Sequence, residues 1–435
     1  MRESLLVDLY ELTMAHSYLK RDLNDRATFA YFVRPPVANR RFLVFAGLDP
    51  ALSHLEGMAF SGDALRYLGG LDLFDRGFLQ YLEGFRFTGD VWAAGEGEIV
   101  FPGEPLLVVS APRIEAQLVE TFLLNTLNFQ TLVASKAARI VLSAGRESTV
   151  VDFSARRDHG ADAAVQVARA AHLAGFQGTS NVLAGALMDI PVVGTMAHSY
   201  VLSFPDELSS FRAFAADHPR PVLLIDTYDT LEGAANAAKV AAELRAAGRE
   251  LSGVRLDSGD LTAESQAVRE LLDEEGFPEV HVFVSGDLDE YRIEQFRAAG
   301  GVAQGYGVGT RLGVSWDVPA LGGVYKLVED SAGPRMKHSP GKVTLPGRPQ
   351  VWRAEDGLRD TVGLADEVLP GRPLLRPVME GGVRRGDPPR LEDLRQRVRS
   401  AVFTLPEDMR RLASAEQPGY PVAISDRLQQ LAQRL

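Results

Sequence analysis

The sequence predicts an α/β fold in which a compact or incomplete (α/β) barrel follows an N-terminal α+β domain. Three observations predict it. From Thr149 onward, short apolar runs each end in polar or glycine residues, and helical segments such as residues 231–247 separate several of them, as parallel βα units require. Polar residues recur where these strands end. Six or seven such units in about 180 residues are too few for a complete eight-unit barrel, which needs ~250 residues.

The predicted N-terminal domain, residues 1–140, begins with an amphipathic helix. Apolar residues recur at helical spacing over residues 5–18, a segment that carries Tyr10 and His16. Residues 114–142 run without Pro or Gly, which predicts a helical stretch, broken near Asn128, that leads into the barrel. Between them we expect strands at residues 27–33 and 41–45, helices at 48–59 and 64–68, and a strand region at 85–110.

The predicted barrel domain, residues 141–340, carries the polar strand ends. A doubly wound sheet has the same βα rhythm as a barrel, so the rhythm alone leaves both folds open. Barrel enzymes place their catalytic residues at the carboxyl ends of strands, and this placement favours the barrel. The residues at successive strand ends are Arg156, His198, Asp226, Asp257, Asp287 and Thr310.

The predicted C-terminal extension, residues 341–435, is rich in Pro, Gly and Arg and has no recognisable motif after Thr344. Two segments, residues 390–403 and 423–435, are predicted to be helical. We expect the extension to pack on the N-terminal domain.

Composition excludes several functional classes. With 46 Lys+Arg against 58 Asp+Glu, the net charge of −12 argues against binding to nucleic acid. Cysteine is absent, which removes disulfide scaffolds and thiolate chemistry. No apolar run approaches the ~18 residues of a membrane span, and charged residues interrupt the first segment, so we expect a cytoplasmic protein without a membrane role. Motifs of zinc proteases, P-loop nucleotidases and serine hydrolases are missing, and the histidines lack ligand spacing.

His198 follows an apolar strand in GTMAHS and could act as a nucleophile or a general base. A histidine at a strand end can instead simply bond the backbone, and for an isolated residue that interpretation is favoured. Asp226 and Asp229 at the next strand end shift the balance, because a carboxylate near His198 would fix its tautomer.

Three further strand ends suggest anion binding. In GVRLDSGDL, Arg255 and Asp257 point to the same face: arginine suits a carboxylate or phosphate, and aspartate suits ribose or Mg²⁺. Glycine-containing ends follow at residues 285–289 and 305–313, where backbone N–H groups could bind phosphate. Ordinary turn chemistry explains each of these segments equally well.

VDFSARRDHG places Phe153 next to Arg156 and Arg157, an arrangement that suits a flat anionic ring or a phosphoester. Core packing of Phe153 and solvation of Arg157 are the alternatives, and each alone is the better interpretation of a single residue.

Taken together, these segments resemble the nicotinate phosphoribosyltransferase family, which has the type II phosphoribosyltransferase fold. The resemblance extends over residues 6–344 and depends on ordered segments, which are far more specific together than singly. They are DLYELTMA, FVR, FAGL, GEPLLVV, TLVASKAARI, FSARR, GTSNVLAG, GTMAHS, DTYDT, RLDSGDL, VSGDLDE, GVGTRL and LGGVYKLV.

The resemblance implies an enzyme of NAD salvage that joins nicotinate to 5-phosphoribosyl 1-pyrophosphate, giving nicotinate mononucleotide and pyrophosphate. It implies Mg²⁺, ATP as a co-substrate, and a homodimer with shared active sites. His198 would be phosphorylated by ATP, and Asp226 would orient it. Tyr10, from a neighbouring subunit, and Phe153 would sandwich the pyridine ring. Asp257 would meet ribose or Mg²⁺.

The resemblance also implies contacts for the substrates. Thr195 and Arg255 would hold nicotinate or an adjacent group, and Thr310 with its glycine loop would bind the phosphate of the phosphoribosyl group. The other implied substrate contacts are Ser180, Gly286, Gly307 and Gly309, with Arg34, Lys136, Arg139 and Arg156 as further anion contacts.

Three alternatives remain at this point. Nicotinamide phosphoribosyltransferases resemble the chain but carry an acidic residue where GTSN has Ser180, so Ser180 favours a carboxylate substrate. Quinolinate phosphoribosyltransferases are typically much shorter, and the GTMAHS segment opposes them. A non-catalytic protein that binds pyridine or phosphoribosyl groups on the same scaffold is the third, opposed by the presence of His198 together with Arg255 and Thr310.

Overall fold

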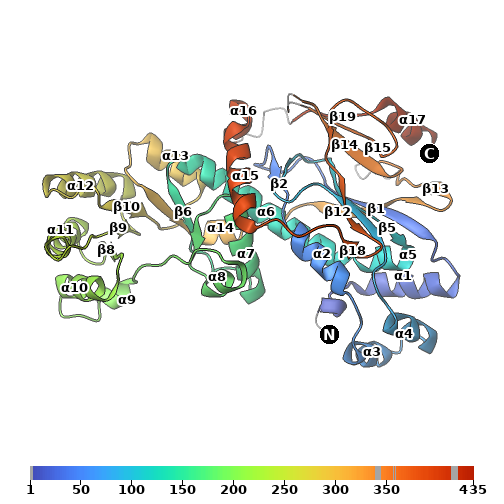
Figure 1. The fold of residues 1–435 in the computed structure, drawn as a ribbon, viewed down its shortest axis with the longest axis horizontal. Coiled ribbons are helices and arrows are strands. Elements are labelled where there is room, and N and C mark those ends of the chain that lie inside the picture. The colour runs from blue at the N-terminus through green and yellow to red at the C-terminus, as the bar shows by residue number, and fades with distance from the viewer. Residues whose placement is uncertain (1–2, 339–343, 356, 358, 413–419) are drawn as a thin grey trace. The chain divides into compact units, whose positions relative to one another are not determined.

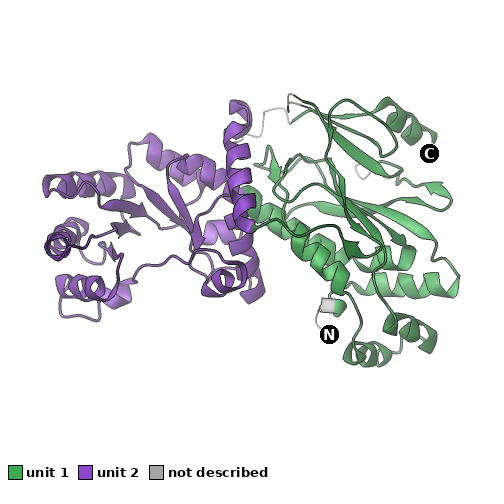
Figure 2. Ribbon diagram, in the orientation of Figure 1, with its two compact units in different colours: residues 1–135, 320–390, 413–435 green, residues 136–319, 391–412 purple. Residues whose placement is uncertain are grey.

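The computed structural model describes residues 3–338, 344–355, 357, 359–412 and 420–435. The chain divides into two compact units, shown in two colours in Figure 2. Unit 1 comprises residues 1–135, 320–390 and 413–435, and unit 2 comprises residues 136–319 and 391–412. Among the described residues, no helix combines the length and the apolar character that a membrane span needs.

Unit 2 contains an open, curled sheet of six parallel strands in the order β7-β6-β11-β10-β9-β8 (Figure 1). Within the described chain, the end strands β7 and β8 do not pair, so the sheet is half of a barrel and the predicted incomplete barrel is confirmed. The strands are β6 (Thr149–Asp152), β7 (Gly178–Thr179), β8 (Val222–Leu224), β9 (Gly253–Leu256), β10 (His281–Val284) and β11 (Gly305–Val308).

The strands of unit 2 are short apolar runs because helices cover them; Val150, Val254 and Leu256 are wholly buried. The helices are α7 (Ala161–Leu173), α8 (Val182–Met188), α9 (His198–Val201), α10 (Glu207–Asp217), α11 (Thr230–Ala246), α12 (Leu261–Glu274), α13 (Glu290–Ala298), α14 (Thr310–Gly313), α15 (Leu391–Thr404) and α16 (Glu407–Arg410).

Aspartates in the loops after the strands begin three of these helices. The side chains of Asp229, Asp260 and Asp289 accept hydrogen bonds from backbone N–H groups in the first turns of α11, α12 and α13. Part of the acidic character that the sequence places at strand ends is therefore helix capping.

Unit 1 is built on an antiparallel sheet of seven strands in the order β13-β12-β1-β5-β3-β17-β18. These strands are β1 (Arg26–Val33), β3 (Asp90–Ala93), β5 (Pro105–Pro112), β12 (Gly323–Asp330), β13 (Gly333–Pro334), β17 (Arg376–Glu380) and β18 (Val383–Arg384). Its helical elements are η1 (Glu3–Leu5), α1 (Leu9–Lys20), α2 (Leu48–Gly57), α3 (Gly62–Gly69), α4 (Arg76–Glu83), α5 (Arg113–Leu118) and α17 (Asp426–Arg434). Helix α6 (Glu120–Ala144) contains the boundary between the units. The predicted helix break lies at Val119, and its expected place near Asn128 is wrong.

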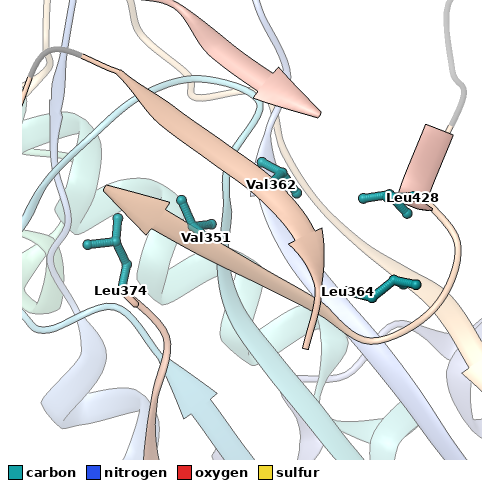
Figure 3. Close-up of a cluster of buried hydrophobic side chains, with 5 residues drawn as sticks. All are labelled: Val351, Val362, Leu364, Leu374 and Leu428. Carbon is teal, nitrogen blue, oxygen red and sulfur yellow. The ribbon is translucent and has the colours of Figure 1, made fainter. Parts of the chain in front are cut away.

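Two smaller sheets complete unit 1. A pair is formed by β2 (Leu43–Val44) and β4 (Ile99–Val100). The other sheet has the order β16-β14-β15-β19, with β14 (Pro349–Arg353), β15 (Asp360–Leu364), β16 (Arg372–Pro373) and β19 (Val422–Ile424). A buried hydrophobic cluster joins this sheet to α17, as Figure 3 shows. Strands β14 and β15 contribute Val351, Val362 and Leu364, Leu374 follows β16, and Leu428 comes from α17.

The two units divide the chain differently from the three expected segments. Strand β12 lies within the segment expected to belong to the barrel, yet it pairs antiparallel with β1 in unit 1. Helix α15 lies within the C-terminal extension but packs on α7 in unit 2, where Glu392 lies 3.4 Å from Nε2 of His172. Most of the extension does pack on the N-terminal domain as predicted, since β17 pairs with β3.

Candidate active site

A pocket of about 700 Å³ lies in unit 2 among residues that follow the carboxyl ends of the strands. Barrel enzymes use this end of the strands for catalysis. The pocket gathers most of the residues that the sequence singles out, although they are far apart in the chain. They are Phe153, Arg156, Ser180, Thr195, His198, Arg255, Asp257, Gly286, Gly307, Gly309 and Thr310.

Two glycines allow segments of the pocket to approach one another closely. A Cβ on Gly307 would lie 2.5 Å from the Phe153 ring, so only glycine allows Phe153 to lie against β11. Gly286 has a φ of +99°, and a Cβ there would lie 2.2 Å from the carbonyl oxygen of Asp257. The backbone geometry of the site therefore requires these glycines whether or not a phosphate is bound.

Arg255 and Arg156 form a cationic region inside the pocket. Arg255 donates from Nη1 to the Thr195 hydroxyl, while its Nε is buried without an acceptor in the described chain. Burial lowers the pKa of Arg255, the carboxylates of Asp257 and Asp226 oppose that shift, and the charge of Arg156 adds to it. Two guanidinium groups that affect one another, one with an unused buried donor, make a site for an anion.

His198 begins α9 and is 40% exposed. Its Nδ1 lies 3.1 Å from the Thr227 hydroxyl, and its Nε2 lies 4.0 Å from Oδ2 of Asp257. Thr227 is not among the residues predicted from the sequence, although only Ile225 separates the DTYDT segment from β8. Its hydroxyl gives the imidazole ring a defined orientation.

Asp226 bonds a different group from the one expected. Its Oδ2 accepts from the backbone N–H of Asp257 at 2.8 Å and from the Ser258 hydroxyl at 2.7 Å. These bonds hold the loop after β9. Among the described residues, the hydrogen-bond partner of the His198 ring is Thr227, which directly follows the predicted partner Asp226 in the chain.

Asp257 is the carboxylate best placed for a hydrated metal ion. Its Oδ1 accepts from the Ser285 hydroxyl at 2.5 Å, and the side chain is 37% exposed. Asp287 also lines the pocket. No group of three or more metal-ligating side chains is found among the described residues. One or two carboxylates suit Mg²⁺ that is shared with substrate phosphates, so the donors present fit such an ion.

Lys136 and Arg139, two predicted anion contacts, bind carboxylates instead. Lys136 is wholly buried, with Nζ 2.6 Å from Oε2 of Glu290 and 2.8 Å from Oδ1 of Asp317. Nε of Arg139 donates to Oε1 of Glu290 at 3.0 Å. An incoming anion would have to displace these carboxylates, and the role of both side chains as anion contacts stays a prediction.

Two cations line the pocket beyond those predicted as substrate contacts. Arg292, in the first turn of α13, lines the pocket, and its Nη1 donates to the carbonyl oxygen of Asp287 at 3.2 Å. Arg157 also lines it, although solvation was the favoured interpretation. The sequence feature that could have indicated Arg292 as a pocket residue is its position three residues after the SGDLD segment.

Tyr10 and Arg34 belong to unit 1. Tyr10 is 46% exposed in the first turn of α1, where burial and the carboxylates of Glu120, Glu11 and Asp8 raise its pKa. Arg34 follows β1 directly. Their roles stay predictions.

Glu11 gives unit 1 a pH-dependent stability. Burial raises its pKa from 4.5 to about 7, against the opposing hydrogen bonds of Thr121. The folded state therefore holds this proton more tightly than the unfolded state, and stability is lost as the pH rises from about 4.5 through about 7.

We expect Glu11→Gln to raise the thermal midpoint by about 2–4 °C at about pH 8 and to change it little at about pH 5. An equal effect at both pH values, or the same pattern in Glu83→Gln at an exposed position of α4, would contradict this account.

Comparison with known proteins gives consistent matches along the chain. Models of the nicotinate phosphoribosyltransferase family match in three parts: the N-terminal domain over residues 5–128, the family domain over residues 148–318, and the C-terminal domain over residues 369–432. A nicotinate phosphoribosyltransferase of Mycobacterium tuberculosis is 47% identical over 430 residues, which cover 98% of this chain and 92% of that protein. One from Bacillus subtilis is 39% identical, covering 97% and 93%.

Solved structures agree with these matches. The crystal structure of human nicotinic acid phosphoribosyltransferase has a TM-score of 0.88 at 31% identity, covering 99% of this chain and 100% of that chain. The nicotinate-nucleotide pyrophosphorylase of Pyrococcus furiosus has a TM-score of 0.76 at 26% identity, covering 92% and 95%.

Proposed function

The chain belongs to the nicotinate phosphoribosyltransferase family, and from this premise we propose how its pocket in unit 2 performs the reaction. The enzyme joins nicotinate to 5-phosphoribosyl 1-pyrophosphate, giving nicotinate mononucleotide and pyrophosphate, a reaction of NAD salvage. Its substrates and products are phosphorylated or carboxylate anions, which do not cross apolar membranes, and we propose that it acts in the cytoplasm.

The cationic region around Arg255 is the main support for placing the pyridine ring of nicotinate in this part of the pocket. The unused Nε of Arg255 and the nearby charge of Arg156 suit the carboxylate of nicotinate, and the Thr195 hydroxyl fixes the Arg255 side chain. Phe153 lines the same pocket and offers a flat apolar face to the ring. A neutral amide would leave these cations without a partner.

The phosphoribosyl group would lie on the loops after β10 and β11. Gly286, Gly307, Gly309 and Thr310 line the pocket there and bring backbone close to the ligand. Loss of pyrophosphate builds positive charge at the anomeric carbon and negative charge on the leaving group. Arg157 and Arg292 would face that leaving group, and Asp257 with Asp287 would hold Mg²⁺ against its oxygens. The metal would neutralise charge on the leaving pyrophosphate.

ATP would act through His198. We propose that the imidazole takes the γ-phosphoryl group of ATP, releasing ADP, and that hydrolysis of this phosphohistidine follows product formation. The added negative charge would attract Mg²⁺ and order the loops around bound substrate, so that ATP energy tightens binding. Thr227 would hold the ring in place for this step.

We further propose a homodimer in which Tyr10 of one subunit completes the pyridine site of the other. The support is that Tyr10 is partly exposed at the start of α1, with the exposed apolar residues Leu6 and Leu9 beside it. An aromatic side chain among exposed apolar residues is typical of an interface.

Product formation with three bases tests this function. The unsubstituted protein is incubated with 5-phosphoribosyl 1-pyrophosphate, Mg²⁺ and either nicotinate, nicotinamide or quinolinate. We expect turnover of nicotinate above that of the other two. Preferred turnover of nicotinamide would contradict the role of Arg255, and ligand binding without turnover would favour the non-catalytic alternative.

Ser180 is expected to favour nicotinate because it places no negative charge against the carboxylate of the base. It lines the pocket after β7, and its backbone N–H donates to the carbonyl oxygen of Asp152 at 2.8 Å. Ser180→Asp should lower kcat/KM for nicotinate by about 100-fold, because two carboxylates would face one another, and should raise the relative rate with nicotinamide. Ser180→Ala is the matched control and should retain turnover of nicotinate. Loss of nicotinate turnover in both variants would contradict a charge effect.

A further inference from the structure

An ion pair between buried Asp289 and half-buried Arg311 joins the segments that follow β10 and β11. Nη1 of Arg311 lies 2.8 Å from Oδ2 of Asp289. Asp289 directly precedes α13, after the loop that follows β10, and Arg311 is the second residue of α14, directly after Thr310. Neither side chain lines the pocket, whereas the loops that they belong to line it with Gly286, Asp287, Gly309 and Thr310.

Asp289 uses both carboxylate oxygens. Its Oδ1 accepts from the backbone N–H of Arg292 at 2.9 Å and so caps α13, while Oδ2 binds Arg311. Only 4% of the residue is exposed. The same carboxylate therefore fixes the helical turn that carries the pocket cation Arg292 and ties it to the neighbouring loop.

Each end of this link is held by further contacts. The guanidinium of Arg311 lies over the Trp316 ring, 5.6 Å from its centre. On the other side, Glu290 is wholly buried and binds Lys136 and Arg139. Two ion pairs outside the pocket lining therefore also fix the first turn of α13.

We infer that Asp289 and Arg311 are positioning residues for 5-phosphoribosyl 1-pyrophosphate. The ion pair sets the spacing between the loop of Gly286 and the loop of Thr310, across which the phosphate and pyrophosphate groups would bind. Backbone donors hold an anion well only when they are placed to within about 0.5 Å, so a change in this spacing weakens binding of the phosphorylated substrate. The inference rests on the proposed function of this pocket.

The nicotinate subsite should be insensitive to the pair. Arg255 donates to Thr195. Phe153 is held on β11 by its backbone N–H, which donates to the carbonyl oxygen of Val308 at 2.9 Å, and its ring lies close to Gly307. A purely structural role would instead lower stability and affect both substrates alike.

Asp289→Asn is the first test, because asparagine still caps a helix but carries no charge. We expect KM for 5-phosphoribosyl 1-pyrophosphate to rise by about tenfold, with KM for nicotinate and kcat nearly unchanged. Calorimetry with inorganic pyrophosphate should show Kd weakened by about tenfold as well. Arg311→Gln breaks the pair from the other side and should give the same selective loss, whereas Arg311→Lys, which keeps the charge, should restore part of it.

Arg297→Gln is the matched control, since Arg297 lies at the far end of α13 and donates to the carbonyl oxygen of Ser143 at 2.7 Å. It should leave all these constants unchanged. Equal losses for nicotinate and pyrophosphate, or unchanged pyrophosphate binding in a folded Asp289→Asn protein, would overturn the inference alone. Failure of the unsubstituted protein to bind pyrophosphate would overturn the proposed function with it.

Discussion

Arg255→Gln is expected to lower kcat/KM for nicotinate by about 100- to 1000-fold, because it removes a charge-assisted pair with the carboxylate of the base and leaves that anion facing fewer cations. The loss should appear mainly in KM for nicotinate, since the contact exists before and during the reaction. Steady-state kinetics at saturating 5-phosphoribosyl 1-pyrophosphate measures it. Arg255→Lys should recover only part of the activity, because an ammonium cannot bond both Thr195 and a carboxylate in the guanidinium geometry.

Arg245→Gln provides the control for Arg255. Arg245 is an exposed arginine of the same unit, paired with Glu279 at 2.7 Å and outside the pocket lining. It should retain full activity. If Arg255→Gln kept the nicotinate KM of the unsubstituted enzyme, the cationic region would not be the carboxylate site.

His198→Ala is expected to abolish the stimulation by ATP and to leave a weak rate that does not depend on ATP. The substitution removes the only proposed acceptor of the phosphoryl group, while Arg255, Asp257 and the glycine loops of the transfer site remain. Parallel assays of nicotinate mononucleotide and ADP, with and without ATP, measure both effects. The ratio of the two rates should fall to about one.

His218→Ala is the control for His198, since His218 is exposed and does not line the pocket. Its ring centre lies 4.1 Å from that of Phe214, with the two rings tilted by 38°. It should keep its ATP stimulation. Unchanged coupling in His198→Ala would remove His198 from the mechanism, whereas loss of both rates would mean that the imidazole also serves the transfer step.

The half-barrel and its site follow from local features of the sequence. Short apolar runs alternate with helices, and parallel strands bring their carboxyl ends to one edge of a sheet. Residues as distant as Phe153 and Thr310 therefore share one pocket, as the strand ends predict. The placement of these residues can be predicted from local sequence because each βα unit repeats the same order of strand, loop and helix.

The features that the sequence did not reveal depend on contacts between distant segments. The pairing of β12 with β1 joins residues nearly three hundred positions apart, and no local pattern predicts such a partner. Lys136 lies on a helix face that reads as apolar, so its carboxylate partners Glu290 and Asp317 could not be inferred. Thr227, and not its neighbour Asp226, contacts the His198 ring. The sequence does not predict which of two adjacent loop residues points toward the histidine, because side-chain direction in a loop depends on the tertiary structure.

The most direct test of the account is formation of nicotinate mononucleotide by the unsubstituted enzyme from nicotinate, 5-phosphoribosyl 1-pyrophosphate and Mg²⁺, with and without ATP. We expect turnover without ATP that rises when ATP is added, together with release of ADP. Absence of nicotinate mononucleotide under both conditions would contradict the transferase pocket, and turnover unaffected by ATP would contradict the phosphohistidine proposal alone.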